Sequence, residues 1–292
     1  MAEQSVSPEL SIILPALNEE TALDDLLIRI KETLAESSYE ILVIDDGSED
    51  GTGEIGRRHG ARVLRHAYRK GNGAAVKRGI REAKGDAILL MDADGQHDPK
   101  DIPRLLEALK EHDMAVGARA KGTRQRAHRW AANRLFSMLA SYLAAEPIAD
   151  LTSGFRVIRA PIAKRYVDLL PNTFSYPSTL TVTLARAGYT IAHVPIIAGK
   201  AKSRSKIRLS SDGLRFLLIL AKIGVGLAPF RVFLPISLLF FFLGMGWYGY
   251  TFFRSHTFTN MSLLLFCTAV IVFMLGLVAE QIAQLRRERR DK

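Results

Sequence analysis

The chain has 292 residues, enough for one or two domains with a buried core. Lys and Arg number 40 against 30 Asp and Glu, for a formal net charge of +10, and 48% of residues are hydrophobic. This composition excludes a wholly disordered chain, and the single cysteine, Cys267, excludes an intrachain disulfide and a metal site built from several cysteines.

The N-terminal part of the chain alternates short apolar runs with segments of helical periodicity. Strands are predicted at 10–14, 39–44, 61–64 and 86–91, and helices at 19–36, 51–59 and 73–83. This alternation predicts an α/β fold with a mainly parallel sheet covered by helices on both faces. Ligands of such sheets bind beyond the carboxyl ends of the strands, so the residues after each strand are candidates for a site.

Polar loops follow three of the four predicted strands. They cover residues 15–20, 45–48 and 92–98. Each loop alone has a structural alternative, because Asp, Asn, Gly and Ser favour turns and helix caps, and Ser48 is placed to cap the helix that begins near Gly51. Three such loops at one edge of the sheet favour a binding site.

Asp92 and Asp94 flank one residue at the end of the fourth strand, so both carboxylates can face one divalent cation. Mg²⁺ or Mn²⁺ held by one or two carboxylates and by substrate phosphates fits this arrangement. Such an ion neutralises a departing diphosphate. His66 and His97 have no partner at metal-ligand spacing, and we expect them to be structural or exposed to solvent.

Several motifs occur in a fixed order. They are Pro15-x-x-Asn18-Glu19, Asp45-Asp46-Gly47-Ser48, Lys70-Gly-Asn-Gly-Ala-Ala75, Asp92-Ala-Asp94-x-Gln96, Asp150-Leu-Thr-Ser-Gly-Phe-Arg156, Phe174-Ser-Tyr-Pro177 and Ser205-Lys206. The first four resemble family 2 glycosyltransferases of the GT-A (Rossmann-like) fold. The later ones are similar to the group of dolichol-phosphate mannose synthases and other polyprenyl-phosphate glycosyltransferases. The resemblance covers roughly residues 10 to 210.

The resemblance implies transfer of one sugar from a nucleotide sugar, GDP-mannose or a UDP-sugar, to dolichyl or undecaprenyl phosphate. The implied nucleotide-sugar contacts are Pro15, Asn18, Glu19, Asp45, Asp46, Asp92 and Gln96. Asp92, Asp94 and Gln96 would hold Mg²⁺ or Mn²⁺, with Asp94 counted as catalytic. Ser205-Lys206 matches the end of the family's Arg-x-x-Gly-x-Ser-Lys pattern, from which the chain departs with Lys200 and Ser203.

Basic residues are concentrated in segments that lead towards the two apolar C-terminal runs. Residues 119–134 include six basic and no acidic side chains, and residues 200–222 include seven basic and one acidic. A lipid phosphate has a second pKa of about 6, so near neutral pH it needs neighbouring cations more than a strong base. The expected acceptor-phosphate contacts are Arg119, Arg126, Arg129, Arg134, Ser205 and Lys206. For 124–134 the alternative is a basic face against anionic headgroups.

We expect Arg119 and Lys206 to be catalytic. Asp150 is the one remaining carboxylate that could act as a base or align the attack. Its structural alternative is to brace the turn at Thr152-Ser-Gly.

Two long uncharged runs lie near the C-terminus, at 232–253 and 261–279. At about 1.5 Å per residue, each can cross a hydrocarbon core about 30 Å thick. The short connection at 254–260 predicts a transmembrane hairpin, with a pair of buried core helices as the alternative. Both flanks of the hairpin are basic, so the positive-inside rule places both termini in the cytoplasm, at an inner or plasma membrane.

These features predict four regions. They are a cytoplasmic GT-A domain at 1–207, an interfacial amphipathic helix region at 208–230, a transmembrane hairpin at 231–285 with spans at about 232–253 and 261–280, and a basic cytoplasmic tail at 286–292. In the second region Arg208, Arg215 and Lys222 share one helical face, and an imperfect third span is the alternative. The lipid bilayer is thus an expected partner. Assembly into a homo-oligomer is possible, and the sequence does not decide it.

Three other classes of protein account for the sequence less well. Nucleic-acid binding explains the charge but neither the hairpin nor the acidic strand ends. A processive membrane polysaccharide synthase of the same fold carries Gln-x-x-Arg-Trp, and the segment Gln125-Arg-Ala-His-Arg-Trp130 has one residue too many. A non-catalytic membrane adaptor has no need of three polar loops at adjacent strand ends.

Overall fold

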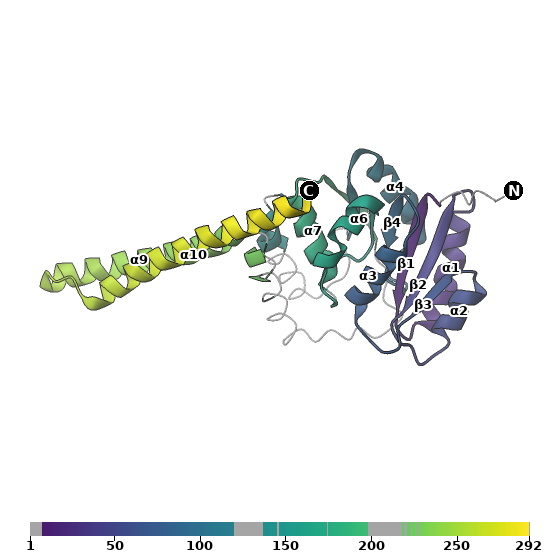
Figure 1. Cartoon of the computed structure of the whole chain (residues 1–292), viewed down its shortest axis with the longest axis horizontal. Helices are drawn as coiled ribbons and strands as arrows, with labels where there is room; N and C mark the ends of the chain where they lie inside the picture. Colours follow the sequence, from purple (N-terminus) through teal and green to yellow (C-terminus); the bar gives the residue numbers. More distant parts are fainter. Residues whose placement is uncertain are drawn as a thin grey trace.

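The computed structural model describes residues 8–119, 137–144, 146–173, 175–197, 218, 221–222, 224–226 and 228–291, without the side chains beyond 285. It consists of a sheet domain and a long helical hairpin that projects from it (Figure 1). The two parts meet beside one helix of the sheet domain, α7 (Tyr176–Arg186).

The sheet has seven strands in the order β3-β2-β1-β4-β6-β5-β7. Their bounds are β1 (Leu10–Ala16), β2 (Tyr39–Asp45), β3 (Arg62–Arg65), β4 (Ala87–Leu90), β5 (Met114–Arg119), β6 (Arg156–Arg159) and β7 (Ile191–Ile196). All neighbouring pairs are parallel except those of β6, which runs antiparallel to both β4 and β5. The mainly parallel α/β sheet predicted from the sequence is confirmed.

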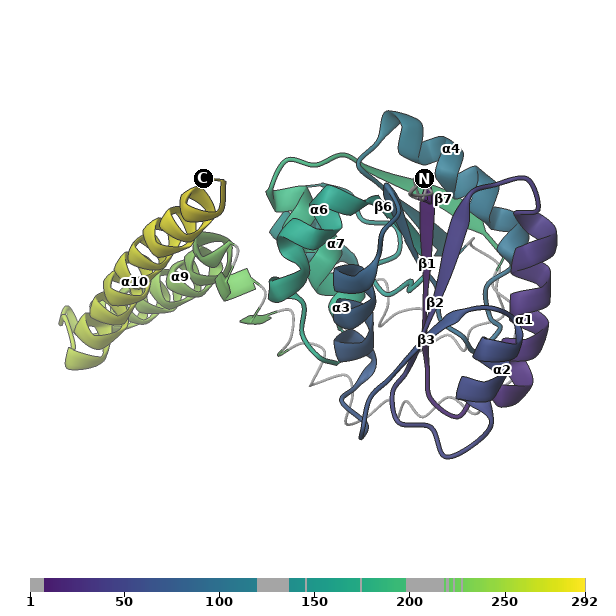
Figure 2. The same ribbon diagram turned by 45° about the vertical axis from the view of Figure 1, so that its right-hand side comes forward.

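Helices cover both faces of this sheet (Figure 2). One face carries α1 (Glu20–Thr33), α2 (Thr52–Arg58) and α4 (Ile102–Glu111), and the other carries α3 (Asn72–Glu82), α6 (Ala160–Tyr166) and α7. Short 3₁₀ turns, η1 (Pro99–Asp101) and η2 (Val167–Leu169), precede α4 and follow α6.

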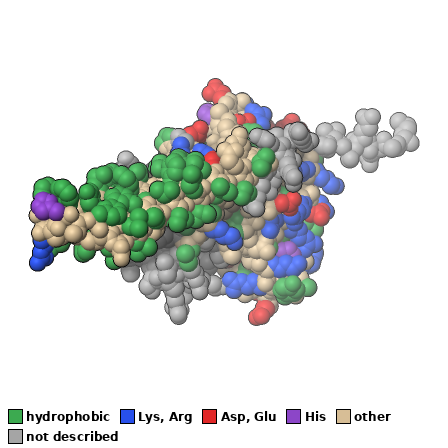
Figure 3. All heavy atoms as spheres, turned by 60° about the vertical axis from the view of Figure 1, so that its left-hand side comes forward, with side chains coloured by type: hydrophobic (Ala, Val, Ile, Leu, Met, Phe, Trp, Pro, Cys, Tyr) green, Lys and Arg blue, Asp and Glu red, His purple; other side chains and the backbone are tan. Residues whose placement is uncertain are grey.

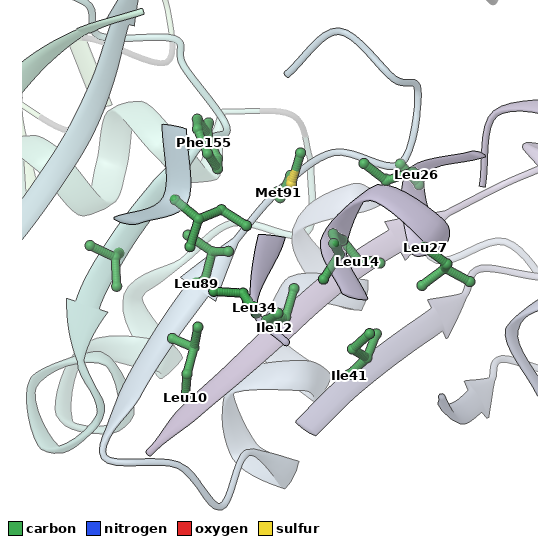
Figure 4. Close-up of a cluster of buried hydrophobic side chains, with 14 of the residues drawn as sticks. Leu10, Ile12, Leu14, Leu26, Leu27, Leu34, Ile41, Leu89, Met91 and Phe155 are labelled. Carbon is green, nitrogen blue, oxygen red and sulfur yellow. The ribbon is translucent and has the colours of Figure 1, made fainter. Parts of the chain in front are cut away.

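The central strand β1 shows why two helical layers are needed. All its residues are buried. Because successive side chains of a strand point to opposite faces, Ile12 and Leu14 enter the cluster that includes Leu26 and Leu27 of α1 (Figure 4), and Ile13 enters the cluster on the α3 side. A strand that is apolar at nearly every position therefore belongs in the middle of the sheet.

The hairpin consists of α9 (Pro229–Ser255) and α10 (Asn260–Asp291). Ser237 Oγ of α9 donates to the carbonyl of Ala269 in α10 at 2.9 Å. Both helices are long and apolar enough to cross a membrane. Only 11% of the most apolar 18-residue stretch of α9, and 17% of that of α10, is buried. Hydrophobic side chains gather along the outside of the hairpin (Figure 3). The predicted hairpin is confirmed, and α10 continues as a helix through the segment expected to form a separate tail.

Candidate active site

The loops after β1 and β2 are tied together at the carboxyl edge of the sheet. Asn18 has a left-handed backbone, with φ of 56°, and its Oδ1 accepts from the backbone N–H of Glu49 at 2.8 Å. The N–H of Asn18 donates to Ser48 Oγ at 3.0 Å, while Asp45 Oδ1 accepts from the N–H of Ser48 at 2.7 Å. Ser48 therefore does not cap α2, which was the structural alternative for its loop. The residue at that cap is Gly51, so the hydroxyl is used between the loops.

Asp46 is buried, and protein groups already occupy both of its carboxylate oxygens. Its Oδ1 lies 2.7 Å from His66 Nδ1 and accepts from the N–H of Lys70 at 2.9 Å. Its Oδ2 accepts from the N–H of Gly71 at 2.8 Å, where φ is 105° and glycine is favoured. Asp46 thus holds the connection between β3 and α3 at the edge of the site.

The other predicted nucleotide contacts lie at the same edge. Pro15 is buried within β1, and the N–H of Glu19 donates to Thr52 Oγ1 at 2.9 Å. Asp45 is also fully buried, and Arg65 Nε lies 3.6 Å from its Oδ2. Of the predicted nucleotide contacts in these two loops, only Asn18 is exposed, and the carboxylates of Asp45 and Asp46 are buried.

The acidic residues after β4 are close enough for the charge of Asp92 to act on Asp94. Asp92 Oδ1 accepts from Asn72 Nδ2 at 3.4 Å. Asp94 Oδ1 accepts from the N–H of Gln96 at 3.1 Å, and Gln96 Nε2 donates to Asp94 Oδ2. The three predicted metal ligands thus lie within one turn of chain, and Asn72 is an additional neighbour that the sequence had not singled out.

The electrostatics of this turn suit a cation. Burial raises the pKa of Asp92, and burial together with repulsion from Asp92 raises the pKa of Asp94. Within the described residues no three His, Cys, Asp or Glu side chains group as a metal site. A divalent ion here would therefore complete its shell with donor phosphates and water, as Mg²⁺ commonly does, and the two carboxylates fit such an ion.

The segment 150–156 closes the other side of the acidic turn. A Cβ at Gly154 would lie 2.4 Å from Asp92 Oδ2, so a side chain there would displace the carboxylate. Arg156 is fully buried, and its Nη1 donates to the carbonyl of Pro177 at 2.9 Å and to Thr181 Oγ1 at 3.0 Å. Its positive charge favours the ionised form of Asp92.

No role was assigned to Arg156 from the sequence. Arginine is almost never fully buried unless it is paired, so its burial was not expected. The signal available was its place at the end of the Asp150–Arg156 motif.

Arg119, the last residue of β5, forms a two-pronged ion pair with Asp150. Arg119 Nε lies 2.8 Å from Asp150 Oδ2, and Nη2 lies 3.1 Å from Oδ1. Asp150 Oδ1 also accepts from the N–H of Thr152 at 3.1 Å, so the carboxylate braces the turn as its structural alternative predicts. Burial acts to raise the pKa of Asp150, but its hydrogen bonds and ion pair with Arg119 hold that pKa below its ordinary value.

The two histidines near the site are buried, as expected of structural residues. His66 contacts Asp46, and His97 stacks on Phe155 with ring centres 5.1 Å apart. Burial lowers the pKa of His97 to about 4, so its ring is neutral at physiological pH.

Several predicted acceptor contacts lie outside the described residues. They are Arg126, Arg129, Arg134, Ser205 and Lys206, together with Lys200 and Ser203 of the same motif.

Two family models match this chain. The model described as Glycosyl transferase family 2 matches residues 11–167, which include the sheet from β1 to β6 and the acidic turn. The chain belongs to this family. The model described as GtrB C-terminal hairpin matches residues 228–285, which correspond to α9 and most of α10.

Curated relatives match about two thirds of the chain. The chain is 34% identical to dolichol-phosphate mannosyltransferase of Pyrococcus furiosus over 215 residues, which are 68% of this chain and 59% of that protein. It is 32% identical to undecaprenyl-phosphate mannosyltransferase of Micrococcus luteus over 200 residues, 63% of this chain and 81% of that protein. The match thus spans less than two thirds of the first relative and most of the second.

Solved structures share the fold. Glucosyl-3-phosphoglycerate synthase of Mycobacterium tuberculosis, in complex with Mn²⁺, UDP-glucose and glycerol 3-phosphate, matches with a TM-score of 0.61 and 23% identity, over 74% of this chain and 80% of that one. At this identity the likeness shows the GT-A fold of the sheet domain.

Proposed function

We propose that this chain is a membrane-anchored enzyme that transfers one sugar from a nucleoside diphosphate sugar to a polyprenyl phosphate. The observation that carries this proposal is a family 2 glycosyltransferase domain that continues into an outwardly apolar hairpin. The names of the Pyrococcus and Micrococcus relatives support a lipid phosphate acceptor. Another relative is named undecaprenyl-phosphate 4-deoxy-4-formamido-L-arabinose transferase, from Edwardsiella ictaluri, so the donor is kept as GDP-mannose or a UDP-sugar.

The donor is proposed to bind at the carboxyl edge of the sheet, over Asn18, Glu19 and the loop 45–48. Asp92, Asp94 and Gln96 would hold Mg²⁺ or Mn²⁺ there. A bound divalent ion supplies positive charge that stabilises the diphosphate as a leaving group. Pro15, Asp45 and Asp46 would act by fixing the shape of this pocket, because the two carboxylates already accept hydrogen bonds from the protein.

The acceptor is proposed to attack through a phosphate oxygen. That oxygen forms a bond to the anomeric carbon while the bond from that carbon to the nucleoside diphosphate breaks, and the leaving diphosphate keeps the electron pair. With a second pKa of about 6, the lipid phosphate is largely ionised at neutral pH and needs no strong base. Cations would bring the two anions together, namely Arg119, Arg126, Arg129, Arg134 and Lys206, with Ser205 beside them.

Asp150 would serve this step through Arg119. Its lowered pKa makes it a weak base, and its two-pronged ion pair holds the guanidinium at the end of β5. We therefore assign Asp150 the alignment of Arg119 in preference to proton removal.

The topology is part of the same proposal. Residues 1–207 would lie in the cytoplasm, 208–230 at the membrane surface, 231–285 in the membrane and 286–292 again in the cytoplasm. The basic flanks of the hairpin support this orientation through the positive-inside rule. Assembly as a homo-oligomer is proposed on the family resemblance alone.

The test is a donor screen with the full-length protein in nanodiscs containing undecaprenyl phosphate and Mg²⁺. GDP-mannose, UDP-glucose, a UDP-hexosamine and a UDP-uronic acid are supplied one at a time. We expect one donor to give both a released nucleoside diphosphate and a lipid-linked sugar, measured by mass spectrometry. If no donor releases nucleotide, or nucleotide is released without a lipid product, the proposed function is wrong.

A further inference from the structure

Glu280 of α10 joins three helices where the hairpin meets the sheet domain. Its Oε2 accepts from the N–H of Phe230, in the first turn of α9, at 3.1 Å. Its Oε1 lies 3.6 Å from Nη2 of Arg186, at the C-terminal end of α7. Only 26% of the Glu280 side chain and 18% of the Arg186 side chain are exposed. A shielded carboxylate that also satisfies a helix-terminal N–H constrains geometry more than an exposed surface pair does.

A second set of contacts holds the base of α9 on the sheet domain. Arg231 donates to the carbonyl of Tyr142, and its guanidinium lies 5.7 Å from the centre of the Tyr142 ring. Val232 packs against a buried apolar cluster that includes Leu143, Leu151 and Val182 of α7. The hairpin is therefore docked on α7 and on the segment that leads to Asp150–Arg156.

The opposite end of α7 contacts the active site. Ser178 Oγ donates to the carbonyl of Leu151 at 3.3 Å. The carbonyl of Pro177 and the hydroxyl of Thr181 accept from Arg156, the buried cation beside Asp92. This helix of 11 residues, about 16 Å long at 1.5 Å per residue, thus contacts segment 150–156 near one end and the hairpin at the other.

We propose that Glu280 is a positioning residue for the transferase reaction. By fixing the hairpin to α7, it fixes the position of segment 150–156, which holds the acceptor contact Arg119 through Asp150. The inference rests on the proposed function. A lipid acceptor reaches the site from the bilayer, and the nucleotide sugar reaches it from water. The angle between hairpin and sheet domain therefore matters for the acceptor and not for donor binding.

Glu280→Gln is the variant that separates an effect on the acceptor from an effect on donor binding. Glutamine keeps an oxygen for the N–H of Phe230 but loses the charge that attracts Arg186. We expect kcat/KM for undecaprenyl phosphate to fall about tenfold, the size of a typical coupling between separated sites, with the Kd for the nucleoside diphosphate unchanged. Glu107→Gln is the matched control, because Glu107 is 72% exposed and pairs only one turn away with Lys110 on α4.

Charge reversal provides the rescue. Arg186→Glu and Glu280→Arg are each expected to lower acceptor turnover, and the double variant is expected to recover part of the loss. The positioning role is wrong if Glu280→Gln transfers as well as Glu107→Gln. It is also wrong if nucleotide affinity falls in parallel with turnover, which would indicate general structural damage. A wild-type protein that forms no lipid product contradicts the proposed function itself, so the two failures are distinguishable.

Discussion

The sheet domain and the hairpin are both rich in apolar residues, but they place them in opposite ways. Every residue of β1 is buried, whereas Phe253 and Leu264 of the hairpin are 86% and 59% exposed. Burying a side chain of this size gains about 1.5–3 kcal/mol relative to leaving it in water. The sheet domain obtains that energy from its own interior. The hairpin can obtain it only from apolar surroundings outside the chain, which a bilayer supplies.

The comparison also separates two kinds of constraint. At the sheet edge, single atoms matter, because carboxylates, amides and backbone N–H groups meet at hydrogen-bonding distance. On the outer face of the hairpin, average hydrophobicity would matter if the proposed membrane surrounds it, since lipid accepts any apolar side chain. Substitutions should therefore act locally and sharply in the first region, and through insertion energy in the second.

The largest effect is expected at the acidic turn. Asp94→Asn removes a charge that would hold the metal and should lower sugar transfer by about a hundredfold to a thousandfold. The protein should stay in the membrane fraction, because the hairpin is untouched. Transfer assays and membrane fractionation check both expectations, with Asp168→Asn as control, since that carboxylate is 80% exposed and pairs with Arg81. Full activity in Asp94→Asn would contradict the metal assignment.

A substitution in the hairpin can introduce a charge, whereas Asp94→Asn removes one from the sheet domain. Ile271 is 58% exposed within the apolar stretch of α10, and Ile271→Arg should make insertion of that helix less favourable by about 2.5–3.5 kcal/mol. We expect more protein to be released by alkaline carbonate extraction, with nucleotide binding by the sheet domain retained. Ile271→Leu is the control. Equal extraction of the two variants would mean that α10 does not span the bilayer.

Two glycines, one beside the acidic turn and one in the hairpin, allow the same Gly→Ala change to be compared in the two regions. Gly154→Ala would place a Cβ against the carboxylate of Asp92, and a shift of about 1 Å there can cost about a hundredfold in rate. Gly246 in α9 has no neighbouring atom within 4 Å of an added Cβ. Gly246→Ala should therefore keep activity and favour the helix by up to about 1 kcal/mol. Comparable turnover in the two variants would contradict the close approach of segment 150–156 to Asp92.

The smallest expected effect concerns acid stability. The folded pKa of Asp150 lies below its ordinary value of 3.8, so its ion pair stabilises the fold above that pH and loses this contribution as pH falls through the folded pKa. The contribution should be about 1 kcal/mol for a pair that keeps some solvent contact. Urea unfolding of Asp150→Asn should show a smaller loss of stability below pH 4 than wild type. An identical pH dependence would indicate that Asp150 is not held ionised by Arg119.

Local sequence patterns predicted much of the fold. The strands β1 to β4 begin within one residue of their predicted starts, because apolar runs bounded by turn residues carry that information locally. No strand was predicted after β4, so β5, β6 and β7 were missed, and β6 shows why. Its residues, Arg156 to Arg159, begin and end with arginine, and their antiparallel insertion between β4 and β5 depends on pairing partners far away in the chain.

The acidic turn could be predicted from strand-end position, yet the environments of its neighbours could not. Helix capping was the structural alternative for Ser48, and its hydroxyl instead accepts from the N–H of Asn18. Arg156 had no assigned role and proves to be a buried cation that donates hydrogen bonds to Pro177 and Thr181 of α7. These partners lie 21 to 30 residues away, which is beyond the range of local spacing rules.

The amino-acid sequence by itself determined the family motifs, the acidic strand ends and the two apolar runs, because each is written in short-range order and composition. The tertiary structure alone decided which carboxylates are engaged by the protein, which arginine is buried beside Asp92, and that Glu280 meets α7. The physical reason is that hydrogen bonds and desolvation depend on which residues, far apart in the chain, are buried next to one another. No local sequence pattern specifies which distant residues become neighbours.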